Sequence, residues 1–166
     1  MPSNHIIVLD NRPDGEPTAS NFKLVTAETP ALNEGQVLVK HHYLSLDPYM
    51  RGRMNAGKNY AQPQPLNEVM IGGTVGEVVE SKHPKFSVGQ TVQCMGGWQE
   101  YSVINASLPG ALKHVNTEKI AISHYLGAVG MPGVTAWYGL NNIIQAKAGK
   151  TVTVSAASGA VGSAYG

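Results

Sequence analysis

The residues best suited to chemistry lie near the end of the chain, where positions 155–162 read SAASGAVG. Gly159, Gly162 and Gly166 follow the spacing G-x-x-G-x-x-x-G. A strand that runs into a glycine-rich turn and then a helix lets backbone N–H groups approach a pyrophosphate, because glycine has no side chain to block the anion. The spacing differs from G-x-G-x-x-G, so the pattern is equally typical of an ordinary turn between a strand and a helix.

A second candidate is Tyr49, which follows the stiff step Asp47–Pro48. A phenol both donates and accepts hydrogen bonds, which suits a substrate carbonyl at a cleft. A tyrosine of the core or of its rim is the alternative interpretation. Arg51 and Arg53 follow in the same turn, and we expect them to be solvated there rather than to bind an anion.

Metal chemistry is disfavoured by the residue types. The chain has one cysteine, Cys94, which excludes an internal disulfide framework and a cysteine-rich zinc site. We expect Cys94 to be a small buried hydrophobic residue. His41 and His42 are neighbours on a predicted strand and therefore point to opposite faces. None of the six histidines is spaced to share a zinc ion with Cys94, so no metal site is expected.

The elements that must position these residues are mostly short strands. The chain has 19 glycines and 10 prolines, which favour many turns. Glycines inside the stretch 69–80 mark a bulge or a close backbone approach. A helical turn is expected within 47–54. Strands are predicted at 5–9, 22–28, 37–46, 69–80, 82–95 and 98–104, a density typical of an all-β barrel or sandwich.

The pattern changes after residue 105. A helix is predicted at 117–129 with Thr117 as its N-cap, and a second helix at 134–144 with Pro132 near its start. A β-branched strand is predicted at 151–157, directly before the glycine loop. The fold class expected from the sequence is therefore mainly β, followed by helices and one strand.

The amino-acid composition argues against several classes of function. The hydrophobic content is 42%, charged residues make up 14% and the net charge is +1, with lysine and arginine scattered. This is a globular composition without the basic stripe of a nucleic-acid-binding protein. No apolar stretch is long and uninterrupted enough to span a membrane. The N-terminus has no signal peptide pattern, and a cytoplasmic location is expected.

Several stretches along the chain carry a family resemblance. They are LSLDPYMRGRM (44–54), GGTVGEVVESKHPKF (72–86), GWQEY (97–101), LGAVGMPGVTAWYGL (126–140) and AASGAVGS (156–163). In this order they resemble the zinc-independent medium-chain dehydrogenase/reductases. DPYMR together with GMPG-x-TA is similar to the alkenal, or prostaglandin-type, double-bond reductases, which include bacterial curcumin reductases.

The resemblance implies a GroES-like β-barrel catalytic domain at residues 1–120, followed by the start of a truncated Rossmann dinucleotide-binding domain at 121–166. Chains of this family are about twice as long. We therefore expect the sequence to be a fragment that is inactive alone, and the full-length protein to form a homodimer. The catalytic residues, and those that would select NADPH over NADH, are expected beyond residue 166.

The resemblance also implies an activity, the NADPH-dependent reduction of the C=C bond of α,β-unsaturated aldehydes or ketones. Zinc-using relatives carry a cysteine where this chain has Asp47, and a histidine–glutamate pair in place of Gly72 and Gly73. Hydroxyl donors would then meet the charge that develops on the carbonyl oxygen, while the cofactor supplies the hydride.

Particular residues take roles from this resemblance. Tyr49 would line the substrate and nicotinamide pocket. Met131 and Thr135 would contact the nicotinamide end, although helix packing accounts for them equally well. The residues expected to bind the cofactor diphosphate are Gly159, Ala160, Val161 and Gly162.

Two other functions stay open at this point. The first is a quinone oxidoreductase of the same superfamily, which the DPYMR motif disfavours. The second is a non-enzymatic GroES-like module used for binding or assembly.

Overall fold

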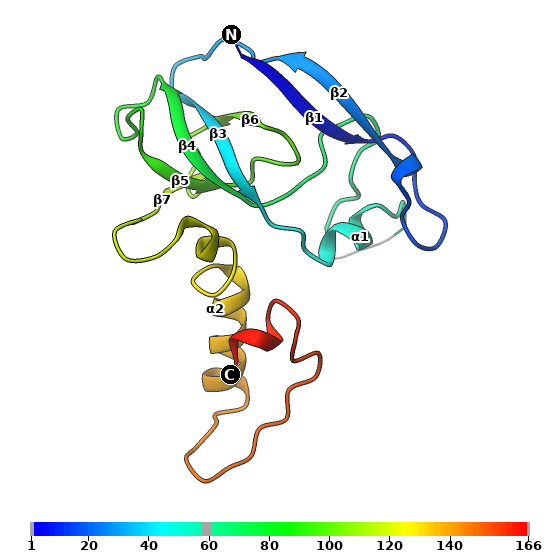
Figure 1. The fold of residues 1–166 in the computed structure, drawn as a ribbon, viewed down its shortest axis with the longest axis vertical. Helices are drawn as coiled ribbons and strands as arrows, with labels where there is room; N and C mark the ends of the chain where they lie inside the picture. The colour runs from blue at the N-terminus through cyan, green and yellow to red at the C-terminus, as the bar shows by residue number, and fades with distance from the viewer. Residues whose placement is uncertain (1, 58–60, 166) are drawn as a thin grey trace. The chain divides into compact units, whose positions relative to one another are not determined.

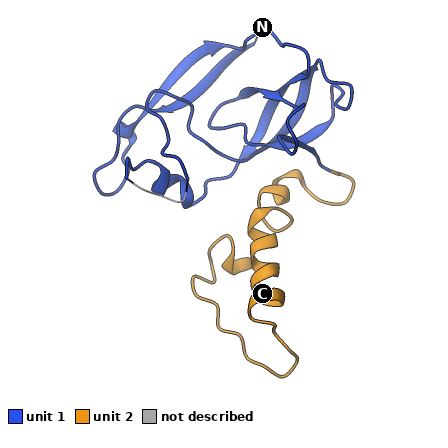
Figure 2. Cartoon of the chain, turned by 180° about the vertical axis from the view of Figure 1, so that it is seen from behind, with its two compact units in different colours: residues 1–115 blue, residues 116–166 orange. Residues whose placement is uncertain are grey.

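A computed structural model describes residues 2–57 and 61–165. These fall into two compact units, residues 1–115 and residues 116–166, which Figure 2 shows in different colours. Each unit is described by itself below.

Two antiparallel sheets make up the first unit (Figure 1). Strand β1 (Ser3–Leu9) pairs with β2 (Phe22–Glu28) along their whole length. The larger sheet has the order β6-β3-β4-β5-β7 and is curled. Its strands are β3 (Gln36–Leu44), β4 (Thr74–Ser81), β5 (Thr91–Cys94), β6 (Tyr101–Asn105) and β7 (Leu112–His114).

The core of the larger sheet is built mainly of valines, together with Cys94 and Leu112. Val37 and Val39 of β3, Val78 of β4 and Val92 of β5 are all fully buried. Residues two apart on a strand point to the same face, so Val37 and Val39 lie together on one face of the curled sheet, while Leu38 between them is buried on the other. A second cluster of Leu9, Met54 and Met70 joins the smaller sheet to the short helix α1 (Tyr49–Arg53).

Gly76 lies where two strands of the sheet approach closely. The register of β3 against β4 shifts between His41 and Tyr43, directly opposite this glycine. A Cβ atom built on Gly76 would collide with the carbonyl oxygen of Lys40 and lie 2.8 Å from the Cα of His41. The glycine thus allows the two backbones to approach at an irregularity, as the sequence predicts.

Each of the six predicted strand ranges overlaps a strand, and the mainly β class is confirmed. Strand β7 is not among the predictions, because its three residues, LKH, are too few to show alternation. The helical turn expected within 47–54 is α1. A 3-10 turn, Ala19–Asn21, precedes β2.

The helix predicted at 117–129 is wrong. The structure has only a 3-10 turn there, Ile122–Leu126, with Ala121 rather than Thr117 before it. Gly127 follows the turn with φ −125° and ψ −112°, a conformation outside the helical region, and ends it. The apolar residues that suggested a longer helix, Ile120, Ile122, Tyr125 and Leu126, all lie before this glycine, and only the last three belong to the turn.

The second helix begins earlier than predicted. Helix α2 spans Met131–Tyr138 and continues as a π-helical turn, Gly139–Ile143. Pro132 lies in its first turn, where the missing N–H and the fixed φ are tolerated. The sequence places the proline correctly near the start of the helix but puts that start three residues too late.

The strand predicted at 151–157 does not form within the described residues. Residues 151–154 have no regular structure, and a series of turns follows them up to the 3-10 turn Gly162–Ala164. A parallel strand needs hydrogen-bonded neighbours and cover on both faces. The second unit offers it no partner strand among residues 116–165, so β-branched composition alone does not produce one.

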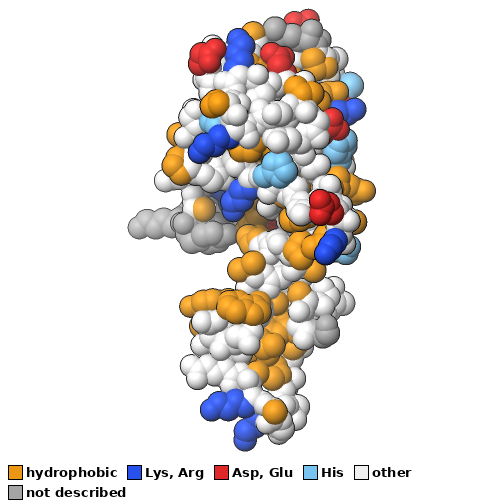
Figure 3. All heavy atoms as spheres, turned by 90° about the vertical axis from the view of Figure 1, so that its left-hand side faces the viewer, with side chains coloured by type: hydrophobic (Ala, Val, Ile, Leu, Met, Phe, Trp, Pro, Cys, Tyr) orange, Lys and Arg blue, Asp and Glu red, His pale blue; other side chains and the backbone are white. Residues whose placement is uncertain are grey.

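Exposed hydrophobic side chains are frequent on the second unit, and many of the orange spheres in Figure 3 belong to it. They are Val129, Met131, Val134, Trp137, Tyr138, Ile143 and Ile144, each at least 45% exposed. None of the helices in residues 2–57 and 61–165 has the length and apolar character needed to cross a membrane.

Candidate functional site

Tyr49 is the first residue of α1, and the chain enters this helix through Pro48 at φ −56°. The backbone N–H of Met50 donates to the carbonyl of Asp47 at 3.1 Å, and that of Arg51 to the carbonyl of Pro48 at 3.2 Å. Tyr49 is partly buried, whereas Met50 is only 3% exposed. The stiff Asp47–Pro48 step thus starts a helix that anchors Met50 inside and holds Tyr49 at its edge.

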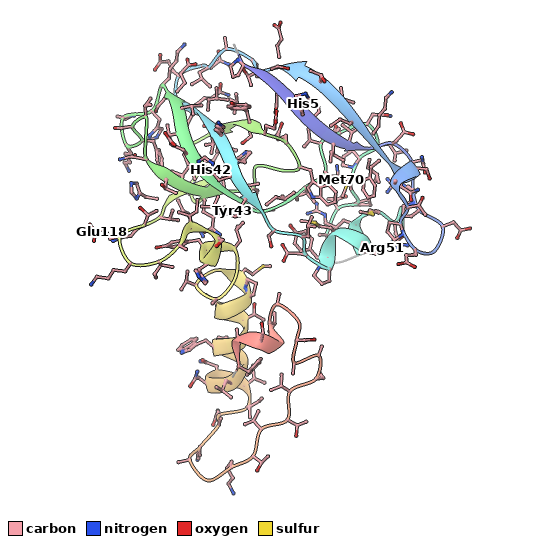
Figure 4. All side chains as sticks on the ribbon, viewed as in Figure 1. His5, His42, Tyr43, Arg51, Met70 and Glu118 are labelled. Atoms are coloured by element: carbon pink, nitrogen blue, oxygen red, sulfur yellow. The ribbon has the colours of Figure 1, made fainter. Side chains whose placement is uncertain are left out.

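The arginines around α1 bind backbone carbonyls. Arg51, labelled in Figure 4, donates to the Oδ1 of Asn55 at 2.8 Å and to the carbonyl of Gly15. Arg53 donates to the carbonyl of Gln62 at 2.9 Å. Arg12 donates to the carbonyl of Met54 at 2.6 Å. Arg51 and Arg53 therefore hydrogen-bond neighbouring loop segments and are not free cations.

Gly72 occupies a crowded position beside α1. A Cβ atom built on it would lie 2.6 Å from Cδ1 of Leu44 and 3.2 Å from both Cε of Met50 and Cδ1 of Trp98. The space that a larger side chain would need at residue 72 is therefore filled by apolar groups. Neither Gly72 nor Gly73 has a side chain that could supply a nitrogen, sulfur or carboxylate ligand to a metal ion.

No cluster of three or more histidine, cysteine, aspartate or glutamate side chains is arranged to hold a metal ion within residues 2–57 and 61–165. The expectation of a metal-free reaction stays a prediction.

A chain of polar side chains runs through the interior of the larger sheet. His41 Nε2 lies 2.8 Å from the hydroxyl oxygen of Ser102, and the hydroxyl oxygen of Thr74 lies 3.4 Å from Sγ of Cys94. The backbone N–H of Gly96 donates to the same Thr74 hydroxyl at 3.2 Å. Sequence reasoning missed this network, because its members are far apart in the chain and lie on four different strands and a loop.

The charge states of this network favour a structural role. Burial, assisted by the neighbouring His42, lowers the pKa of His41 to about 4. Burial raises the pKa of the Cys94 thiol, although hydrogen bonds from Thr74 and Ser102 oppose the shift. Near neutral pH the imidazole is uncharged and the thiol is protonated, so the sulfur is a poor nucleophile. Cys94 is 6% exposed, which confirms the prediction of a small buried residue.

In the second unit, the four predicted cofactor residues Gly159–Gly162 lie in one compact loop. The N–H of Gly159 donates to the carbonyl of Ala156 at 2.8 Å, and that of Ser163 to the carbonyl of Gly159 at 2.9 Å. Ala156 has φ +48°, a left-handed conformation that alanine rarely adopts. Such strain is often found at ligand-binding loops.

The side chains of the loop are small enough for a diphosphate to approach the backbone, because no residue in 155–162 is larger than valine. Gly162 has a local reason to be glycine, since a Cβ there would collide with the carbonyl oxygen of Ala156 and lie 2.9 Å from the Cα of Ala157. Ala160, by contrast, is exposed. The loop also borders a groove of about 630 Å³, lined by Leu140, Val152, Val154, Ala157, Gly162, Ser163 and Tyr165.

Met131 and Thr135 lie one turn apart on α2, and both are exposed. Met131 is 59% exposed. The hydroxyl of Thr135 donates to the carbonyl of Met131 at 2.7 Å, within the helix. The structure thus brings these two residues together, while their contact with a nicotinamide stays a prediction.

Several known proteins are similar to this chain in sequence. The profile of a family described as the N-terminal domain of oxidoreductase matches residues 5–111. The NADPH-dependent curcumin reductase of Escherichia coli is 44% identical over 159 residues, which cover 96% of this chain and 45% of that protein. Prostaglandin reductase 1 of Rattus norvegicus is 43% identical over 153 residues, covering 92% and 44%. The NADP(+)-dependent 2-alkenal reductase of Nicotiana tabacum is 38% identical over 169 residues, covering 99% and 48%.

Among solved structures, CurA from Vibrio vulnificus in complex with NADPH superposes with a TM-score of 0.89 at 46% identity. The match covers 98% of this chain and 47% of CurA. The fold and the sequence together define an oxidoreductase domain of the GroES-like kind. The chain belongs to the medium-chain dehydrogenase/reductase family, in its double-bond reductase branch. It spans about half the length of the relatives it matches.

Proposed function

We propose that this chain supplies the substrate domain, residues 1–120, and the beginning of the dinucleotide-binding domain, residues 121–166, of an NADPH-dependent reductase. Its substrates are α,β-unsaturated aldehydes and ketones, and the bond reduced is C=C. The observation that carries the proposal is the 44% identity, over 96% of the chain, to a protein named NADPH-dependent curcumin reductase. The relatives named 2-alkenal reductase and prostaglandin reductase support the same class of substrate.

NADPH, when bound, supplies the hydride for such a reduction. In our proposal the small residues Gly159, Ala160, Val161 and Gly162 bind its diphosphate. The composition of the loop and the left-handed backbone at Ala156 support this assignment. Met131 and Thr135 contact the nicotinamide end, a role that their shared exposed position on α2 permits.

Tyr49 binds the substrate carbonyl in this proposal. Its phenol can donate a hydrogen bond to the oxygen on which negative charge develops during the reduction. The support is positional, since the Asp47–Pro48 step and the buried Met50 fix the helix on which the tyrosine lies.

Assembly and location complete the proposal. We place the full-length reductase in the cytoplasm as a homodimer. A single cysteine, buried and protonated, is compatible with a reducing compartment. Sedimentation of the purified protein tests the dimer, and fractionation of cells tests the location.

The deciding experiment assays the protein expressed from the intact gene with NADPH and a panel of enals, enones and quinones. Consumption of NADPH with formation of the saturated carbonyl compound is the expected result. Reduction of quinones alone would contradict the proposed substrate class. Binding of enones without turnover would favour the non-enzymatic binding module.

A further inference from the structure

A cavity of about 270 Å³ in the first unit has no part in the proposed reaction. Its described lining residues lie on or beside β4, β5, β6 and β7, and none of them belongs to α1 or to the second unit. The lining therefore includes neither Tyr49 nor any residue of the predicted cofactor loop. The volume is just below the range of about 300–1,000 Å³ typical of ligand pockets, so the cavity suits a small molecule.

The cavity lies where the two edges of the curled sheet come near each other. Strands β6 and β7 are the first and the last in the order β6-β3-β4-β5-β7, and no ladder joins them among the described residues. Yet Ile104 of β6 and Lys113 of β7 line the same cavity. The seam between the edge strands thus leaves a hollow instead of a closed ladder.

The cavity is open to solvent, because several of its lining residues are exposed. Met95 is 55% exposed although its side chain is apolar. Gly110 and Lys113 are exposed as well. A ligand can therefore enter without disrupting the sheet.

The less exposed part of the lining is apolar. Ile104 packs against the buried valines of the larger sheet, and Cys94 is only 6% exposed. Ala111 adds a methyl group on the other side of the seam. The flexible thioether of Met95 adapts to ligands of different shape. These residues offer an apolar surface to a short alkyl or aryl group.

A positive charge borders this apolar surface. Lys113 is the partner of Gln93 across β5 and β7, so both side chains point to the same face of the sheet. Within residues 2–57 and 61–165 the Lys113 ammonium takes part in no ion pair. Lys82, by contrast, donates to the carbonyl of Leu32 at 2.6 Å. The Lys113 charge is thus available to an anion in the cavity.

We propose that this cavity binds a small carboxylate with a short alkyl or aryl body. Met95, Ile104 and Ala111 contact the body, and the Lys113 ammonium donates a charge-assisted hydrogen bond to the carboxylate. A neutral molecule of the same size forgoes the bond to Lys113, and an anion without an apolar part forgoes the contacts with Met95 and Ile104. The proposal goes beyond the reductase function and does not depend on it.

The probe is hexanoate, titrated into the intact protein with labelled methionine methyl groups. The methyl signal of Met95 should shift and saturate, while that of Met131, in the other unit, stays in place. Hexanol has the same length without the charge, and acetate has the charge without the chain. Each should bind at least about threefold more weakly than hexanoate. Equal affinity for hexanol and hexanoate, or no saturable shift at Met95, would overturn the proposal.

A pair of lysine variants tests the anion contact. Lys113→Gln should weaken hexanoate binding about three- to tenfold and leave hexanol binding unchanged, and it should fold because this side chain is exposed. Lys85→Gln removes the same charge from an exposed lysine in the turn between β4 and β5, outside the cavity, and should bind hexanoate as the wild type does. Equal weakening in both variants would show long-range attraction only and refute the contact.

Met95→Gln tests the apolar contact, because glutamine has a similar length and Met95 is exposed enough to be replaced without loss of the fold. Calorimetry should show hexanoate and hexanol both weakened at least about threefold. Unchanged affinities would place the alkyl chain elsewhere and contradict the proposal. These titrations contain neither NADPH nor an enone, so a failure of the proposed reductase activity leaves their outcome unaffected.

Discussion

At the scale of single residues, His41 makes stability depend on pH. Its pKa is lowered to about 4 by burial, with the neighbouring His42 contributing, and its Nε2 lies against Ser102. The Nδ1 atom is buried without a partner in the described part of the chain. An added proton would therefore have no acceptor inside the sheet.

The direction of this pH dependence follows from the protonation of His41 in the folded and unfolded states. Between about pH 6.5 and about pH 4 the unfolded chain takes up a proton at residue 41 while the folded protein does not, so acidification favours unfolding. Acidification over this range should lower the free energy of unfolding of the wild-type protein by roughly 2–3 kcal/mol through His41, and His41→Gln should abolish that contribution. Urea unfolding at both ends of that pH range measures it. His114→Gln, an exposed histidine on β7, should keep the wild-type pH dependence.

A test of the predicted cofactor loop needs a residue that can be replaced without a collision inside the loop. Gly162 is unsuitable, because a side chain there collides with the carbonyl of Ala156 whether or not a phosphate binds. Ala160 is exposed and lies between the two glycines. Its substitution can therefore report on an approaching anion without disturbing the loop.

We expect Ala160→Asp to weaken NADPH binding by the intact reductase at least about tenfold, because a carboxylate would repel the diphosphate. Ala160→Asn has the same shape without the charge and should bind NADPH within about threefold of wild type. Titration of the cofactor by fluorescence or calorimetry gives both affinities. Equal weakening in the two variants would argue that no diphosphate lies at this loop.

At the scale of elements, the pairing of β3 with β4 depends on Gly76. Its missing side chain leaves room for the carbonyl of Lys40 and the Cα of His41, where the register shifts. Backbone atoms cannot rotate aside as a side chain can, so the collision has to be relieved by moving a strand.

Gly76→Ala should therefore lower the free energy of unfolding by roughly 1–3 kcal/mol or more. The control is Gly57→Ala, because a Cβ at Gly57 has no neighbour within 4 Å. Urea unfolding of both variants measures the difference. A stability loss no larger at residue 76 than at residue 57 would show that the sheet is looser there than the structure indicates.

At the scale of the whole molecule, the two units differ in how well they bury their apolar side chains. Both clusters of buried hydrophobic residues lie within residues 1–115. The second unit exposes seven large hydrophobic residues, including Trp137 at 61% and Ile143 at 69%. Exposed apolar surface of this kind favours association.

We expect residues 1–115 expressed alone to fold and unfold in one cooperative transition. This shorter chain should bind less hydrophobic dye and associate less than the 166-residue chain. Circular dichroism during heating, dye fluorescence and light scattering measure these properties. Loss of fixed tertiary signals in the shorter chain would contradict the assignment of an independent core to the first unit.

The sequence by itself determines the strands of the first unit and the family. The β-branched and apolar stretch at 37–46 predicts β3, and the DPYMR and GMPG-x-TA motifs carry the resemblance that the relatives support. These signals are local in the chain, so they can be read without coordinates. The prediction at 151–157 fails for the complementary reason, because a parallel strand depends on partners and not on its own composition.

Only the tertiary structure decides which distant residues meet. The sequence shows that Gly72 lacks a side chain, but not that Leu44, Met50 and Trp98, from three separate segments, pack around it. His41 shifts its pKa because the curled sheet buries it against Ser102, sixty-one positions further along the chain. Close packing and the burial of polar atoms are properties of the folded chain, and no spacing rule along the sequence encodes them.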